Sequence, residues 1–315
     1  MASAKAKSVP PADTRVVLKV DVDTAVGFCD GVRRLADLLA VMDIPASFFI
    51  SMGPDHSGRA LKRLVKPGFL AKQMRSGAAG SYGLRTMLYG ILLPGPVIAR
   101  RAPRLMNRLI NLGHEVGLHG WDHVFWHDHL LRLDESRIRR ELEAAVSLYR
   151  RLTGLAPASF AAPGWQVSPT AYAVLSELGI SHTSCTRGRA PFRPLVQGRP
   201  LPLLELPTTL PSLDELLGRH GVSPDNAGRR LARMVRPGEL NVFTLHAEVE
   251  GRGFLPVLGE FCRLLRRRGV RFLRLVDAAR EAAAEKVPAG GLAYAPVPGR
   301  AGLVTWQAAA LGGTR

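Results

Sequence analysis

Two short clusters of metal-ligand side chains lie far apart in the chain. Asp21 and Asp23 follow a short β-branched run, Val16–Val20, which is typical of a buried strand. Two carboxylates at positions i and i+2 of a strand end point the same way, so both are expected to face one pocket. His119 and His123 stand at i and i+4, a spacing that places two imidazoles on one face of a helical turn. The two clusters together predict one shared metal site.

The chemistry of such a site follows from its donor atoms. One carboxylate and two imidazoles would hold a tetrahedral divalent metal ion and leave one position open for water. The other aspartate would be free to take a proton from that water, which predicts metal-assisted hydrolysis. Two alternatives stay open on these residues alone. Aspartates at strand ends are often helix caps, and a pair of histidines can lie on a helix surface without any functional role. The same ligand set also occurs in non-haem iron oxygenases, so it names neither the metal nor the reaction.

A third element is His246, which follows the apolar run Asn241–Leu245. A histidine at a strand end can be an ordinary core residue. Hydrolysis of an amide also needs a proton donor for the leaving nitrogen, however, and histidine suits that task near pH 7. We therefore expect His246 to join the site.

The elements that must position these residues alternate between strands and helices. This alternation predicts an α/β fold with a parallel sheet or barrel and helices outside it. The polar residues at the carboxyl ends of several strands match the place where such folds put their sites. The expected strands are 16–20, 46–50, 115–118, 159–162, 181–184, 241–245 and 270–273, and the expected helices are 32–42, 135–153, 170–178 and 254–268.

Composition and charge narrow the class of protein. The chain has 315 residues, 46% of them hydrophobic and 22% charged, which is ordinary for one large globular domain or two smaller ones. The net charge of +17 indicates an acidic partner, whether nucleic acid, anionic lipid or a phosphorylated substrate. The three cysteines, Cys29, Cys185 and Cys262, form no CxxC pair, which argues against a disulfide framework and fits a reducing compartment.

The positive charge gathers in residues 56–114, which contain no acidic residue. Exposed-looking apolar residues accompany eleven lysines and arginines there, and this mixture predicts a basic amphipathic insertion on an anionic membrane surface. A solvated insertion packed on the domain is the simpler alternative. Nucleic-acid binding is disfavoured because the aromatics are few and no known motif accompanies them.

The ends of the chain carry no sign of structure or of membrane insertion. Residues 1–14 are polar, without the apolar core of a signal peptide, and are expected to be disordered. The longest apolar stretch, 87–99, is interrupted by Gly and Pro and is shorter than the roughly 20 residues of a membrane-spanning helix. Residues 286–315 are rich in Ala, Gly and Pro and are expected to form a poorly ordered tail. These features predict a cytoplasmic protein whose catalytic domain spans residues 15–285.

The order Asp-x-Asp, His-x-x-x-His and a late Leu-His resembles the polysaccharide deacetylase family. Closer features resemble those members that remove the formyl group from 4-deoxy-4-formamido-L-arabinose on undecaprenyl phosphate, a step in the lipid A modification that confers polymyxin resistance. The resemblance covers roughly residues 15–276. The segments that carry it include Lys19-Val-Asp-Val-Asp-Thr, Ala46-Ser-Phe-Phe, Gly53-Pro-Asp, His114-Glu-Val-Gly-Leu-His-Gly-Trp-Asp-His, Ala162-Pro-Gly-Trp, Pro191-Phe-Arg-Pro, Leu206-Pro-Thr-Thr-Leu-Pro and Thr244-Leu-His-Ala-Glu-Val-Glu-Gly.

The resemblance implies a distorted, incomplete (β/α)7-type barrel and a role for each residue of the site. Asp23, His119 and His123 would be the metal ligands, Asp21 the general base and His246 the general acid. The resemblance implies one divalent ion, with zinc favoured by the ligands and manganese or cobalt able to serve similar chemistry. Oligomeric state is not indicated.

Substrate-binding residues are less well defined by the pattern. Trp121 and Trp165 are expected to wall a small acyl pocket, and Arg59, Arg187 and Arg193 are expected to read the substrate phosphate. Many family members carry an arginine in an Arg-x-Pro motif that orients the catalytic base. Here the corresponding stretch is Ala161-Ala-Pro-Gly-Trp, without an arginine, and we expect Arg187 to take its place.

Two rival functions remain. An N-deacetylase of peptidoglycan or another glycan would keep the metal site but act outside the cell, and no export signal is recognised. A non-catalytic anionic-lipid-binding protein would have no reason to keep the complete set of candidate site residues. The sequence therefore favours the deformylase, peripherally associated with the inner face of the cytoplasmic membrane.

Overall fold

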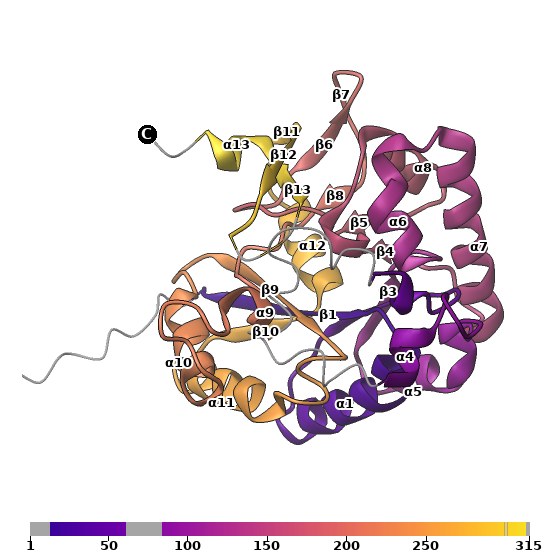
Figure 1. Ribbon diagram of the computed structural model, residues 1–315. Coiled ribbons are helices and arrows are strands. Elements are labelled where there is room, and N and C mark those ends of the chain that lie inside the picture. Colours follow the sequence, from indigo (N-terminus) through magenta and orange to yellow (C-terminus); the bar gives the residue numbers. More distant parts are fainter. Residues whose placement is uncertain (1–12, 61–83, 299, 301, 313–315) are drawn as a thin grey trace, which may run out of the picture.

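A curled parallel sheet forms the centre of the molecule (Figure 1). The computed structural model describes residues 13–60, 84–298, 300 and 302–312. In this part of the chain eight strands form one sheet in the order β10-β1-β2-β3-β4-β5-β8, and β9 pairs with β1. Every pairing in this sheet is parallel. The strands are β1 (Arg15–Val22), β2 (Ser47–Ile50), β3 (Glu115–Leu118), β4 (Ser159–Phe160), β5 (His182–Thr183), β8 (Leu204–Glu205), β9 (Leu240–His246) and β10 (Arg271–Leu273).

Helices lie around the outside of this sheet (Figure 1). The longest, α7, begins after Asp134, whose side chain accepts a hydrogen bond from Arg137 N, and ends at Gly154, which adopts the left-handed conformation. The helices are α1 (Val32–Val41), α4 (Leu84–Leu88), α5 (Leu105–Asn111), α6 (His123–His129), α7 (Glu135–Thr153), α8 (Pro169–Glu177), α9 (Leu213–Leu216), α10 (Pro224–Met234), α11 (Leu255–Arg266), α12 (Leu275–Ala283) and α13 (Ala308–Leu311).

Strand β1 separates two layers of the core. Val16, Leu18, Val20 and Val22 join the large cluster that packs under the helices, whereas Val17 joins a second cluster with Phe49 and Val242 from neighbouring strands. Burying each such side chain stabilises the fold by roughly 1.5–3 kcal/mol. Because side chains alternate along a strand, the odd-numbered positions of β1 point into the curl of the sheet. This alternation directs the polar end of β1 toward the interior.

The predicted α/β architecture is confirmed. The run predicted as 16–20 lies within β1, the strand predicted as 115–118 and the helix predicted as 135–153 have those bounds, and 241–245 lies within β9. The two-residue strand β8 was not predicted, although β4 and β5, which are equally short, lie within the predicted runs 159–162 and 181–184.

The expected poorly ordered tail differs from the structure. Its described residues form β11 (Ala289–Gly290), β12 (Leu292–Pro296), β13 (Leu303–Gln307) and α13. β12 pairs with β13, while β11 extends a small sheet with β6 (Arg193–Val196) and β7 (Arg199–Pro200). Val297 and Val304 pack against Trp165, and Arg187 N donates to Thr305 O. The low charge of this segment suggested disorder, but strand pairing satisfies much of its backbone, and Val297 and Val304 are buried.

The N-terminal prediction falls mostly outside the described residues, which begin at Asp13; Thr14 is buried at the start of β1. Part of the predicted basic insertion, residues 61–83, also lies outside them. Within the remainder, which connects β2 to β3, α5 buries Leu105, Met106 and Leu109 in the main core. Leu88, Ile91 and Leu92 of the same connection are exposed. None of the helices in the described ranges combines the length and apolar character needed to span a bilayer.

Candidate active site and metal centre

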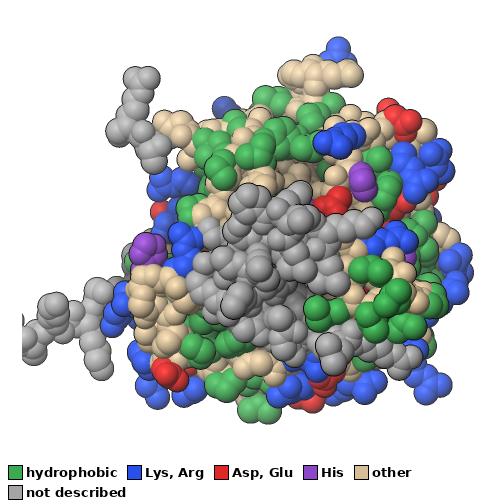
Figure 2. Space-filling view, viewed as in Figure 1, with side chains coloured by type: hydrophobic (Ala, Val, Ile, Leu, Met, Phe, Trp, Pro, Cys, Tyr) green, Lys and Arg blue, Asp and Glu red, His purple; other side chains and the backbone are tan. Residues whose placement is uncertain are grey.

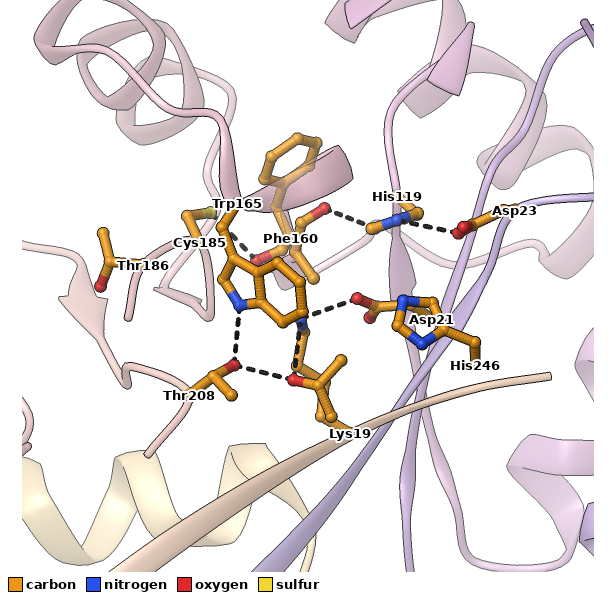
Figure 3. Close-up of polar contacts among 12 residues, drawn as sticks. Lys19, Asp21, Asp23, His119, Phe160, Trp165, Cys185, Thr186, Thr208 and His246 are labelled. Atoms are coloured by element: carbon orange, nitrogen blue, oxygen red, sulfur yellow. Dashed lines mark hydrogen bonds and ion pairs between the residues drawn. The ribbon is translucent and has the colours of Figure 1, made fainter. Parts of the chain in front are cut away.

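The predicted site residues meet at the carboxyl edge of the central sheet (Figure 3). Asp21 lies near the end of β1 and Asp23 follows that strand. His119 comes directly after β3, and its backbone N–H donates to Ile50 O at the end of β2. His246 is the last residue of β9 and is the register partner of Asp21. Three strands distant in sequence therefore end at one point, which is the place where parallel sheets assemble their sites.

Asp23, His119 and His123 form a candidate metal-ligand cluster. One ligand atom from each residue lies within 4.8 Å of the others. Asp23 Oδ1 is 3.2 Å from His119 Nε2, and Asp23 Oδ2 is 3.4 Å from His123 Nε2. His119 Nδ1 lies 2.8 Å from the carbonyl of Ala161, to which it donates. This hydrogen bond fixes the tautomer and leaves the Nε2 lone pair to face Asp23, as in histidines that bind metals. The residues present therefore fit a divalent metal ion.

The i, i+4 spacing predicted that the two histidines share a helical turn, and this prediction was wrong. His119 follows β3, whereas His123 begins α6. Gly120, with a φ of 80°, makes the turn between them, and Asp122 caps the helix by accepting from Phe125 N. Their ring centroids are nonetheless 5.2 Å apart. The imidazoles converge because a glycine turn brings the start of the helix back over the strand end.

The electrostatics favour a charged Asp23. Burial by itself would raise the pKa of this carboxyl group, but His123 and His119 more than offset burial and hold the pKa well below its usual range. A carboxylate kept ionised beside two imidazoles is suited to a cation.

Asp21 occupies a different environment from Asp23. Its Oδ2 accepts a hydrogen bond of 2.8 Å from Lys19 Nζ, and this ion pair is almost completely buried. Its Oδ1 is also buried and has no hydrogen-bond partner among the described residues. Asp21 therefore presents one occupied and one free oxygen at the edge where Asp23 and His246 lie.

Two buried glutamates that the sequence did not assign support this site. Glu248 Oε1 accepts three hydrogen bonds of 2.8 Å, from the backbone of Asp23 and from the backbone and hydroxyl of Thr24. Burial, and then the charge of Asp23, raises the pKa of Glu248 well above its usual value. Glu250 Oε2 accepts from His246 N, and burial raises the pKa of Glu250 to about 8. The signal available in the sequence was a pair of glutamates two and four residues after His246, alternating with Ala247 and Val249.

The two predicted wall residues, Trp165 and Trp121, lie near the candidate site residues. Trp165 is the one beside His246. Its ring is almost fully buried, 6.3 Å from that of His246 in an edge-on arrangement, and its Nε1 donates to Thr208 Oγ1. Its backbone has a φ of 54°, a left-handed conformation that is uncommon for a bulky residue and that is found at functional sites. Trp121 is half-buried beside Gly53, whose backbone N–H donates to the Trp121 carbonyl. Both tryptophans thus lie near strand ends of the site.

The three predicted phosphate-reading arginines are placed apart. Arg187 is buried, and its Nη1 is 3.4 Å from both carboxylate oxygens of Glu215. Arg59 is exposed and donates to Gly90 O, while Arg193 lies on β6 and donates to Pro202 O. None of the three has a described contact with Asp21. The expectation that Arg187 orients Asp21 is therefore not met, because Arg187 faces Glu215 instead.

Comparisons with known proteins agree with this architecture. Residues 9–183 match the family model described as polysaccharide deacetylase. A protein of Shewanella sediminis (strain HAW-EB3), named "Probable 4-deoxy-4-formamido-L-arabinose-phosphoundecaprenol deformylase ArnD", is 33% identical over 84% of this chain and 85% of its own length. A protein of the same name from Wigglesworthia glossinidia brevipalpis is 28% identical over 88% of this chain and 96% of its own.

Solved structures show the same fold at low sequence identity. A Mycobacterium smegmatis protein assigned as a polysaccharide deacetylase superposes with a TM-score of 0.63 at 20% identity, over 94% of this chain and 99% of that chain. The allantoinase PuuE superposes with a TM-score of 0.61 at 17% identity, over 88% of this chain and 93% of that chain. The family model and the relatives therefore show that this chain belongs to the polysaccharide deacetylase family.

Proposed function

We propose that this protein is a metal-dependent hydrolase that removes the formyl group from 4-deoxy-4-formamido-L-arabinose phosphoundecaprenol. The product is the 4-amino sugar lipid used to modify lipid A in polymyxin resistance. The observation that carries the proposal is the meeting of Asp21, Asp23, His119, His123 and His246 at one sheet edge, in a chain whose relative of that name matches 84% of its length.

Asp23, His119 and His123 are proposed to hold the metal ion. Their carboxylate and imidazole donors suit zinc, with manganese or cobalt as alternatives of similar chemistry. A divalent ion held there would supply a Lewis acid that polarises the formyl oxygen and makes an attacking water more acidic.

Asp21 and His246 are proposed to move the protons. Asp21 takes a proton from the attacking water through Oδ1, the oxygen that Lys19 does not occupy. The new C–O bond forms as the carbonyl becomes tetrahedral. His246 then donates a proton to the sugar nitrogen as the C–N bond breaks, because an unprotonated amide nitrogen would leave as a strongly basic anion. Formate and the free amine are the products.

The substrate-facing walls are proposed to come from the tryptophans. A formyl carbon carries only hydrogen, so its pocket needs little room, and Trp165 beside His246 narrows the site accordingly. Trp121 is the proposed second wall, on the side of β2. Arg59, Arg187 and Arg193 are the residues proposed to contact the substrate phosphate.

Mass spectrometry of the lipid substrate tests the function. Purified protein incubated with formamido-arabinose phosphoundecaprenol in detergent should lower the lipid mass by that of one CO, since hydrolysis replaces formyl with hydrogen. A chelator should abolish this change, and added zinc, manganese or cobalt should restore it. Activity on N-acetylated glycans but not on this lipid would contradict the proposed substrate. A protein that hydrolyses neither would contradict the proposal that it is an enzyme of this kind.

We further propose that the enzyme reaches its lipid by docking on the inner face of the cytoplasmic membrane. Leu88, Ile91 and Leu92 are exposed apolar side chains. Figure 2 shows hydrophobic side chains over this region, with Lys and Arg nearby. A separate open cleft is lined by Arg33, Arg104 and Arg108, of which Arg108 pairs with Asp37. Each cation at an anionic surface contributes on the order of 1 kcal/mol to membrane binding.

Flotation with anionic liposomes tests this docking. At low salt the protein should float with vesicles that contain phosphatidylglycerol, and high salt should release it because cations are screened. The double variant Ile91→Asp/Leu92→Asp should stay at the bottom. Val41→Asp, which changes an equally apolar exposed residue at the end of α1, is the matched control and should still float. Wild-type protein that sediments at low salt would refute the docking.

A further inference from the structure

We propose that Lys19 is the residue that positions the catalytic base, in place of the arginine that the family resemblance led us to expect. The inference rests on the proposed function, in which Asp21 is that base. It assigns a role to a residue that the sequence pattern left unassigned. The lysine acts through Asp21 and has no predicted contact of its own with the substrate.

The geometry of β1 places Lys19 for this task. Lys19 stands two residues before Asp21, so both side chains leave the same face of the strand. Nζ is 2.8 Å from Asp21 Oδ2, and the lysine side chain is completely excluded from solvent. A fully buried lysine is rare and costly without an acidic partner, and Asp21 is the acidic partner that the described ion pairs give it.

A chain of hydrogen bonds holds the ammonium group in position (Figure 3). Trp165 Nε1 donates to Thr208 Oγ1, which shares a hydrogen bond of 2.8 Å with Thr244 Oγ1. Lys19 Nζ in turn donates to Thr244 Oγ1 at 3.4 Å and lies 5.2 Å from the centroid of the Trp165 ring. Strand β9, the loop after β8 and the Trp165 turn therefore all contribute to the position of Nζ.

The consequence for Asp21 is an ordered division between its two oxygens. Lys19 occupies Oδ2, while Oδ1 is buried without a partner among the described residues. A carboxylate anchored through one oxygen cannot rotate freely, so Oδ1 stays aimed in one direction. A general base gains from such fixed orientation because proton transfer depends on geometry as well as basicity.

The other two cationic side chains described near Trp165 face acidic residues other than Asp21. Arg187 and Arg300 also face the Trp165 ring, at 5.2 and 4.4 Å from its centroid. Arg187 pairs with Glu215, and Arg300 lies 3.5 Å from Glu215 and 3.9 Å from Asp214. The cation that the structure places against Asp21 is thus Lys19.

Three substitutions at Lys19 test the inference. Lys19→Met keeps the length of the side chain and removes its charge, and should lower kcat about a hundredfold with KM and bound metal unchanged. Lys19→Arg should recover at least a tenth of wild-type kcat, because a guanidinium also donates to a carboxylate. Lys19→Ala should be inactive and should regain activity when propylammonium is added to fill the site. Glu115→Gln breaks a buried pair with His182 at the opposite sheet edge and serves as the control, with a lower Tm and normal kcat.

The outcomes separate positioning from structural support and from a wrong function. If Lys19→Met keeps wild-type kcat, or if its loss is matched by lost metal and neither arginine nor propylammonium restores turnover, the inference is overturned. If the wild type does not deformylate the lipid, the proposed function fails. The kcat of each Lys19 variant relative to the wild type is then measured with an aryl formate ester. A Lys19→Met loss with cation rescue on that ester would still support the positioning role, and an unchanged rate would overturn it.

Discussion

Asp21→Asn should lower kcat for deformylation by about a thousandfold, within the range that a positioned general base contributes. The amide of asparagine cannot take a proton from the attacking water, although it has the same shape as the carboxylate. The proposed metal ligands Asp23, His119 and His123 are unchanged, so bound metal measured by atomic absorption should stay at the wild-type level. Single-turnover kinetics on the lipid substrate provide the rate.

Stability has to be separated from chemistry in this variant. Asparagine leaves the buried Lys19 cation without its carboxylate, and removing one partner of a buried pair costs about 3–5 kcal/mol. The double variant Asp21→Asn/Lys19→Met removes both charges and should recover much of the lost Tm while remaining inactive. Asp277→Asn, a change of the same kind on α12, is the matched control. Wild-type kcat in a folded, metal-loaded Asp21→Asn protein would exclude Asp21 as the base.

His246→Gln should lower kcat for the formamide substrate by about a thousandfold as well, since the leaving nitrogen would depart without its proton. An aryl formate ester has a leaving group that needs no protonation. The variant should therefore retain most of its activity on that ester, after correction for spontaneous hydrolysis. The ratio of kcat/KM for amide and ester is the measurement, and it isolates the acid from the rest of the site.

His114→Gln is the matched control for His246→Gln. His114 is buried at the opposite edge of the sheet, where its Nδ1 accepts from Ala46 N, and burial lowers its pKa to about 4. This variant should lose some stability and keep the wild-type ratio of amide to ester activity. An equal loss on both substrates in His246→Gln would show that His246 is not the acid and instead supports the site as a whole.

The local part of the fold could be predicted from short-range patterns. Two elements illustrate this: the β-branched strand run 16–20 and the capped amphipathic helix 135–153. Both can be recognised because the residues that define their periodicity and their ends are close together in the sequence. The tail beyond residue 286 could not be predicted in this way. Its order depends on contacts with Arg187 and Trp165, more than a hundred residues earlier.

The same division holds for the site. Asp21, Asp23, His119 and His123 were recognisable because their residue types and spacings name a chemistry. Lys19 was hidden because a lysine in a strand is usually a solvated side chain, and nothing in the sequence states that it is buried. Arg187 was expected in its place, but the curl of the sheet directs Arg187 to Glu215.

Residue types and their spacing were enough to identify the chemical groups of the site and the strand ends that carry them. The partners of these groups follow from the tertiary structure. Strand β9 lies beside β1 in a register that places His246 next to Asp21. The turn at Gly120 brings His123 close to His119. The physical reason is that spacing along a chain fixes which face a side chain leaves from. Which distant side chain it meets depends on strand order and on the curl of the sheet, and these arise from the packing of the whole core.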